Sequence, residues 1–148
     1  MAINRRLEAF YSQTTYRALF KKKSIDFRIG DQKKYRRLAF CNLSIKSWAF
    51  ISAENPYSIK LSERENYFRS AQLSRYLSLK KRNYVLGLGI PDCVDWPVEL
   101  GFFILNISMS DAKYIGNKFQ QNAILWFRPM TPIKLVWLVE STLSCENI

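Results

Sequence analysis

One stretch in the first half of the chain constrains the fold more than any other, because a strand, a turn and a capped helix follow one another directly. The apolar run over residues 48–53 predicts a buried strand, and Asn55 and Pro56 come directly after it. Pro56 lacks a backbone N–H and keeps the preceding residue out of the helical region, so the chain must turn there. Ser62 and Glu65 have the spacing of a capping box, which predicts a helix start. A polar loop in this position is a frequent place for a binding site.

Hydrophobic spacing along the rest of the chain predicts a mixture of helices and strands. The expected helices cover residues 3–12, 32–43, 62–82 and a segment that Ser110 and Asp111 begin; the expected strands cover residues 15–20, 24–29, 48–53, 84–89, 101–107, 123–127 and 133–138. We expect a single α/β domain over residues 1–148, with an α+β variant as the alternative. In it, a mixed central sheet of about five or six strands is packed by about three helices. Residues 139–148 are expected to form a loose C-terminal tail.

The composition is that of a folded domain. Of the 148 residues, 48% are hydrophobic and 15% are aromatic, which argues against disorder. The longest apolar runs are far too short to cross a bilayer, and the first residues contain no apolar signal core. We therefore expect a cytoplasmic protein without a membrane partner.

The chain contains no histidine, and this absence excludes several mechanisms. Ser-His-Asp and Cys-His nucleophile pairs are ruled out, as are zinc sites that need histidine and the usual proton carrier at neutral pH. No glycine motif completes a phosphate loop or a dinucleotide fingerprint, so neither a cofactor nor a metal is expected. Whether the protein is an enzyme stays open. An acid/base pair would come from Glu99 with Glu65 or Asp95, while Arg69 could hold an anionic group.

Positive charge is in excess and clustered. The net charge is +11, from 23 Lys and Arg against 12 Asp and Glu. Two of the clusters have neighbouring aromatic residues and consist of Lys33, Lys34, Arg36 and Arg37 and of Lys80, Lys81 and Arg82. These residues form either a solvated surface or a face that binds phosphates. The second interpretation makes the chain a basic nucleic-acid-associated module with a polyanion as its partner, which is the alternative function.

The long helix expected over residues 62–82 has one stripe that is apolar in its second half and polar in its first turns. Asn66 and Arg69 lie on the polar part, so we expect them to point inward beside the loop that contains Asn55 and Pro56. They either tie the loop to the helix or contact a ligand directly.

Five short patterns together resemble a bacterial family of uncharacterised proteins, domain of unknown function 3293, from about Leu7 to about Val136. They are Ala53-Glu54-Asn55-Pro56, Ser58 followed by Leu61-Ser62-Glu63-Arg64-Glu65-Asn66, Arg69 with Leu73, Trp96-Pro97-Val98-Glu99, and Phe119-Gln120-Gln121-Asn122-Ala123. The chain departs from the family pattern at Ser52 and Glu54, where Thr and Trp are expected, and at Gln120, where glycine is common. The resemblance implies no activity; it supports the expected fold and a set of polar positions.

Those polar positions lie where strands give way to loops or helices. They are Asn55, Ser58, Asn66, Arg69, Glu99, Gln121 and Asn122. If strands connected by helices run parallel, several of these side chains converge at one edge of the sheet. Such a set would suit a binding site for a polar small molecule or nucleotide beside the turn at Pro56. It could equally form a hydrogen-bond network that only locks the loops.

Overall fold

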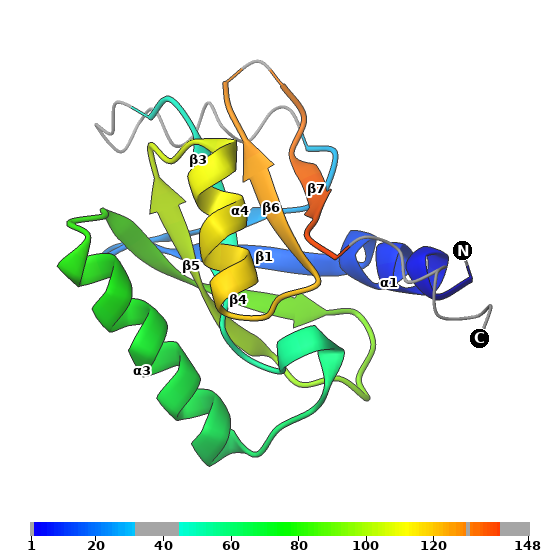
Figure 1. The fold of residues 1–148 in the computed structure, drawn as a ribbon. Helices are drawn as coiled ribbons and strands as arrows, with labels where there is room; N and C mark the ends of the chain where they lie inside the picture. The colour runs from blue at the N-terminus through cyan, green and yellow to red at the C-terminus, as the bar shows by residue number, and fades with distance from the viewer. Residues whose placement is uncertain (1, 32–44, 130, 140–148) are drawn as a thin grey trace.

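A computed structural model describes residues 2–31, 45–129 and 131–139 as a single α+β domain (Figure 1). Its elements are α1 (Ala2–Ser12), β1 (Thr14–Leu19), β2 (Ser24–Phe27), β3 (Trp48–Ser52), the 3₁₀ turn η1 (Pro56–Ser58), α3 (Glu63–Leu79), β4 (Tyr84–Pro91), β5 (Glu99–Leu105), α4 (Met109–Lys118), β6 (Ala123–Phe127) and β7 (Lys134–Trp137). The expected fold class is confirmed in its α+β form, with seven described strands rather than five or six. The helix expected over residues 32–43 and almost all of the expected tail lie outside the described residues.

The sheet has the strand order β2-β1-β4-β5-β3-β6-β7, and each of its six strand pairs is antiparallel. β3 lies between β5 and β6, and all five of its residues are buried. Each of the helices α3 and α4 crosses over one intervening strand. The strands that a helix connects therefore run in the same direction but do not pair. As a result, the C-terminal end of β3 lies beside the N-terminal ends of β5 and β6.

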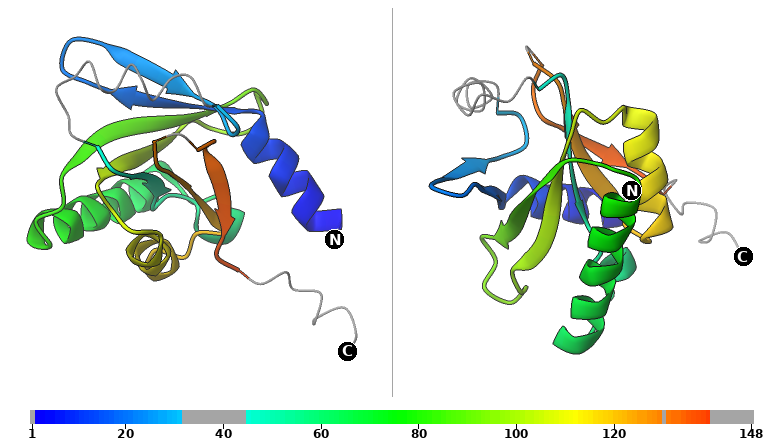
Figure 2. Two further views of the ribbon diagram at one scale, coloured as in Figure 1. Left: turned by 90° about the horizontal axis from the view of Figure 1, so that it is seen from above. Right: turned by 90° about the vertical axis from the view of Figure 1, so that its left-hand side faces the viewer.

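Both faces of the curled sheet are covered by packed side chains (Figures 1 and 2). On one face, α3 and α4 bury side chains such as Leu73, Leu77 and Ile115 against the central strands. The other face is concave and is filled largely by aromatic rings, which include Trp48 and Phe103. Their apolar area is what holds the sheet in its curl, since each large aromatic side chain removes about 150–250 Å² from water.

Backbone hydrogen bonds draw the two edges of the curled sheet together at one end. The amide of Gly30, which follows β2, donates to the carbonyl of Ile133 at 3.1 Å, and the amide of Ile133 donates to Asp31 at 3.3 Å. Ile133 directly precedes β7. The sheet is therefore a half-barrel whose edge strands meet at these loops.

Helix starts follow local signals closely. The predicted capping box is confirmed, because the Glu65 amide donates to Ser62 Oγ at 3.2 Å and the Ser62 hydroxyl donates to Glu65 Oε1 at 3.0 Å. α4 begins earlier than expected: Ser108, not Ser110, accepts the Asp111 amide at 3.0 Å. Both serines have the right chemistry, and Ser108 is the one whose backbone is extended.

Three glycines have side-chain neighbours where a Cβ would stand. A Cβ at Gly101 would collide with the Phe50 ring, and one at Gly116 would collide with Leu138. A Cβ at Gly87 would come within 2.5 Å of the Phe103 ring and 3.0 Å of the Arg17 carbonyl oxygen. Close packing thus accounts for the glycine inside α4.

None of the described helices combines the length and the hydropathy needed to span a membrane.

The two glycines of β4 give a matched test of this packing. Gly87→Ala should lower the free energy of unfolding by about 1–3 kcal/mol, because an over-packed core forces neighbours to move. Gly89→Ala is the control, since its Cβ would have no heavy atom nearer than 3.8 Å. Urea unfolding measures both variants. Equal destabilisation of the two would contradict the assigned packing.

Candidate functional site

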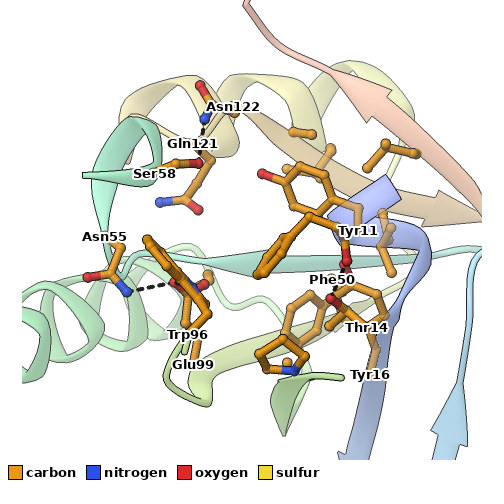
Figure 3. Close-up of a pocket in the computed structure, with 18 residues that line it drawn as sticks. Tyr11, Thr14, Tyr16, Phe50, Asn55, Ser58, Trp96, Glu99, Gln121 and Asn122 are labelled. Atoms are coloured by element: carbon orange, nitrogen blue, oxygen red, sulfur yellow. Dashed lines mark hydrogen bonds between the residues drawn. The ribbon is translucent and has the colours of Figure 1, made fainter. Parts of the chain in front are cut away.

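A cavity of about 60 Å³ opens at the sheet end where β3 finishes and β5 and β6 begin. One water needs about 10–15 Å³ by this measure, so several waters or one compact ligand would fit. Polar side chains from the loops and from the start of β5 gather on one side, and aromatic rings from α1, β1 and β3 lie on the other (Figure 3). The cavity therefore has a polar wall and an aromatic wall.

The Asn55 side chain joins the three segments that build the polar wall. Its Nδ2 donates to Glu99 Oε1 at 2.6 Å, while its Oδ1 accepts the Leu61 amide and Asn66 Nδ2, each at 2.9 Å. Asn66 Oδ1 accepts a hydrogen bond from the backbone N–H of Asn55 at 2.9 Å. A backbone N–H can only donate, so the Leu61 contact fixes which way the Asn55 amide is turned. Every polar atom of this side chain is thus occupied by the protein.

The backbone of the loop is strained in a way that asparagine tolerates. Asn55 has φ 47°, and Tyr57 and Ser58 follow with φ 52° and 60°. Left-handed backbone is uncommon for residues with a Cβ and least costly for asparagine and glycine. The amide of Tyr57 donates to the Gln120 carbonyl at 2.8 Å, which ties the turn to the end of α4.

Glu99, the first residue of β5, is a mostly buried carboxylate on the cavity wall. The Trp96 indole N–H donates to its Oε1 at 3.1 Å, so that one oxygen accepts both Trp96 and Asn55. Burial raises the pKa of Glu99, and the two hydrogen bonds lower it by less. Within the described part of the chain, no protein donor is paired with Oε2.

Burial also raises the pKa values of other ionisable groups near Glu99. It raises the pKa of Tyr11 to about 12, with a further rise from the Glu99 charge and a lowering from the Ser58 hydroxyl. Burial is the largest cause that raises the pKa of Tyr16 as well, followed by Tyr11 and Glu99. The pKa of Glu54 is raised by burial first and then by the charge of Glu99.

The end of α4 and the turn η1 complete the polar wall. Asn122 Nδ2 donates to Ser58 Oγ at 2.8 Å. Gln121 Nε2 donates to the carbonyl oxygens of Glu54 and Phe119, each at 3.2 Å. Because carbonyls only accept, these contacts fix the Gln121 amide with its nitrogen toward the backbone, and its Oε1 has no protein donor among the described residues.

The first helix supplies part of the aromatic wall. The rings of Phe10 and Trp96 meet edge to face at a centroid distance of 5.9 Å, and those of Tyr11 and Trp137 at 5.8 Å. Thr14 Oγ1 donates to the Phe10 carbonyl at 2.7 Å where α1 ends. α1 is thus fixed to β1, to β7 and to the loop before β5, beside the cavity.

Two of the seven predicted site residues lie behind the cavity wall rather than on it. Asn66 is engaged with Asn55, as described above. Arg69 Nε donates to the Ala53 carbonyl at 2.5 Å, Nη2 to the Phe119 carbonyl at 2.6 Å and Nη1 to Gln120 Oε1 at 3.2 Å. Burial lowers the pKa of Arg69. In this arrangement both residues tie the loop to α3 and α4.

The other five predicted residues line the cavity together: Asn55, Ser58, Glu99, Gln121 and Asn122. The carboxylates considered as acid/base partners of Glu99 do not line it, since Glu65 caps α3 and Asp95 lies in an exposed loop. Gln120, where glycine was expected, has φ 59°, so the turn after α4 keeps a left-handed residue.

Sequence reasoning missed the aromatic wall. Tyr11, Thr14, Tyr16 and Phe50 line the cavity but carry no local signal of it, because they come from α1, β1 and the middle of β3. Trp96 could have been found, since it stands three residues before Glu99 in the Trp-Pro-x-Glu pattern.

The predicted basic cluster that falls within the described residues does not line this cavity. Lys80, Lys81 and Arg82 follow α3, and Arg82 Nη2 lies 2.7 Å from Asp111 Oδ2. The other predicted cluster, Lys33, Lys34, Arg36 and Arg37, lies outside the described residues.

Removing the donor from the contact between Asn55 and Glu99 tests the hydrogen-bond network of the polar wall. Asn55→Asp keeps the shape but loses the Nδ2 donor, which should destabilise the fold by about 1–3 kcal/mol. It also sets two carboxyls side by side, which raises a pKa in the folded state, so stability should fall further as pH rises from 4 to 7. Thermal unfolding across that pH range measures it.

The rescue variant is Asn55→Asp with Glu99→Gln. The introduced glutamine amide can donate to the introduced aspartate, although its nitrogen then takes the place of the oxygen that accepts the Trp96 N–H. The double variant should therefore recover part of the lost stability, and its pH dependence should flatten. A double variant whose stability loss is the sum of the two single losses would show that the two side chains do not interact.

A family model described as "Protein of unknown function (DUF3293)" matches residues 51–124, which is half of the chain. The matched segment runs from β3 into β6 and contains all seven predicted site residues, whereas Tyr11, Thr14 and Tyr16 precede it. Neither a curated protein nor a solved structure matches the chain.

Proposed function

We propose that this chain, which belongs to the DUF3293 family of proteins of unknown function, binds a small polar molecule in the cavity beside Asn55 and Pro56. The observation that carries the proposal is Glu99, a mostly buried carboxylate on the wall of the cavity. Taking a carboxylate out of water is costly, and such groups gather at functional sites more often than in ordinary cores.

The hydrogen bonds of the wall support binding over a purely structural role. A network that only locks loops would engage every polar side-chain atom of its members, as it does for Asn55 and Arg69. Glu99 and Gln121 instead each keep one oxygen without a protein donor among the described residues. Both residues line the same cavity. A ligand that donates hydrogen bonds would supply the missing partners.

Filling the cavity should remove binding without removing the fold. Ala123 lines the cavity, and Ala123→Leu would occupy its space. In a thermal-shift screen of small polar molecules, a compound at about 100 times its Kd stabilises the wild type by about 2.7 kcal/mol. We expect Ala123→Leu to lose that shift.

The matched control is Ala71→Leu, the same substitution on the exposed side of α3, which should retain the shift. The NMR signal of the Trp96 indole N–H reports binding independently, because that group contacts Glu99 in the wall. A compound that stabilises both variants equally and leaves this signal unmoved would bind elsewhere and contradict the proposal.

A second candidate function, nucleic-acid binding, is favoured by the outer face of α3. Tyr67 and Phe68 are 71% and 54% exposed, and the Arg64 guanidinium lies 5.9 Å from the Phe68 ring centroid. Lys80 and Lys81 extend the positive charge past the end of the helix. Exposed aromatic rings with basic neighbours suit stacked, single-stranded nucleic acid.

Titration with short single-stranded and double-stranded oligonucleotides at two salt concentrations tests this candidate. Binding should weaken steeply as salt rises, and Tyr67→Ala should weaken it at both concentrations. Leu79→Ala is the control, since Leu79 is equally exposed but cannot stack on a base. Absence of binding at low salt would eliminate this function.

A further inference from the structure

The cavity of the proposed function has chemistry that distinguishes among polar ligands. We infer that it selects a compact planar group that presents N–H donors, either neutral or protonated, such as an amidine or the amino edge of an aminopyrimidine, and that it rejects phosphates and carboxylates. This inference rests on the proposed binding function and assigns its ligand class.

The atoms left without a protein partner are acceptors. Asn55 and Trp96 both donate to Glu99 Oε1, which leaves Oε2 for a ligand. Gln121 is fixed by two backbone carbonyls with its nitrogen toward the protein, which leaves its Oε1. Glu99 and Gln121 both lie on the polar side of the cavity (Figure 3). A carboxylate and an amide that line one cavity, each with an oxygen left over, call for two donors on one ligand.

A ligand cannot bind both carboxylate oxygens of Glu99 in the usual bidentate way. A guanidinium or amidinium group usually takes both oxygens of a carboxylate, but Oε1 already accepts two protein donors. One ligand N–H would therefore reach Oε2, and its second would go to a different acceptor on the wall. This arrangement favours an NH₂ group, whose two N–H bonds diverge, such as one nitrogen of an amidine or the amino group of an aminopyrimidine.

Nothing on the cavity wall compensates an anion. No Lys or Arg is among the residues that line the cavity in the described part of the chain. Arg69, behind the wall, is engaged by three protein oxygens. The first residues of α3 and α4 do not line the cavity either, so neither helix start offers its amides to a phosphate there.

A phosphate or carboxylate in the cavity would instead meet the charge of Glu99. Two like charges a few ångströms apart in a poorly hydrated site repel strongly. A nucleotide could enter only by its base, with its phosphates held outside the cavity. Of the two ligand classes expected from the sequence, a polar small molecule and a nucleotide, the second is thus restricted to binding through its base.

The aromatic wall fits a flat ligand. Tyr16 and Phe50 meet at a ring-centroid distance of 5.1 Å, and both line the cavity with Trp96 and Tyr11. Ring faces attract cations and stack on planar groups. Burial raises the pKa of Tyr11 to about 12, so its phenol stays neutral and adds no negative charge beside Glu99.

Two pairs of probe compounds test the inferred ligand class. The members of each pair are similar in shape but differ in charge or in the placement of hydrogen-bond donors and acceptors. Benzamidine and benzoate have nearly the same outline but opposite charge, and cytosine has an amino donor and a ring-nitrogen acceptor where uracil has a carbonyl acceptor and a single ring N–H donor. We expect benzamidine or cytosine to shift the Trp96 indole N–H signal and raise Tm, and benzoate and uracil to do neither. Glu99→Gln should weaken benzamidine binding about tenfold or more.

The control variant is Glu65→Gln, which changes the same residue type in the capping box of α3, away from the cavity; it should bind as the wild type does. If Glu99→Gln does not fold, the two probe pairs on the wild type decide the question alone. Preference for benzoate or uracil would overturn the ligand class and leave the proposed function standing. If no donor-bearing probe moves the Trp96 signal, the ligand class is wrong. If no polar compound of any class moves it, the proposed function fails with it.

Discussion

The side chain of Asn55 is the interaction on which the rest of the site depends. It follows a strand buried at every residue, and it holds the start of the α3 segment through Leu61 and Asn66 while it donates to Glu99 at the start of β5. These contacts join residues up to 44 positions apart. Because Asn55 also takes a left-handed backbone at φ 47°, it sets both the direction of the loop and the position of the carboxylate.

The antiparallel sheet explains why these groups meet at all. β3 pairs with β5 on one side and β6 on the other, so the end of β3 adjoins the beginnings of both neighbours. Each helix that leaves or enters this end crosses one strand, which places α3 and the end of α4 close enough for Arg69 to reach the carbonyls of Ala53 and Phe119. The aromatic filling of the concave face then walls the cavity on its far side. The contacts that hold this end of the fold together therefore also form the walls of the site.

Much of the fold and the polar half of the site could be predicted from the sequence. Ser62 with Glu65 and the turn at Pro56 act within a few residues, and these local signals gave the boundaries of β3 and α3 closely. Five of the seven predicted side chains share the cavity because they sit at strand ends, and the ends of neighbouring strands meet. The strands that helices connect run in the same direction, as considered, but they do not pair, and the ends that meet belong to antiparallel neighbours.

What could not be predicted depends on distant contacts. Tyr11 reaches the cavity only because α1 packs against Trp96 and Trp137, which no local pattern encodes. Arg69 looked able to hold an anion, yet three backbone and side-chain oxygens from other segments engage it. Whether a polar side chain bonds to the protein or stays available for a ligand depends on such distant partners.

The ionisation of Glu99 is the property that links its burial to its role. Carbon-13 NMR of the side-chain carboxyl, followed as pH is varied, measures it directly. The account predicts a pKa above the ordinary 4.5, because burial outweighs the donors Asn55 and Trp96, and a fall in that pKa when a cationic ligand occupies the cavity. A pKa at the ordinary value, unchanged by any ligand, would show a solvated surface carboxylate and contradict the account.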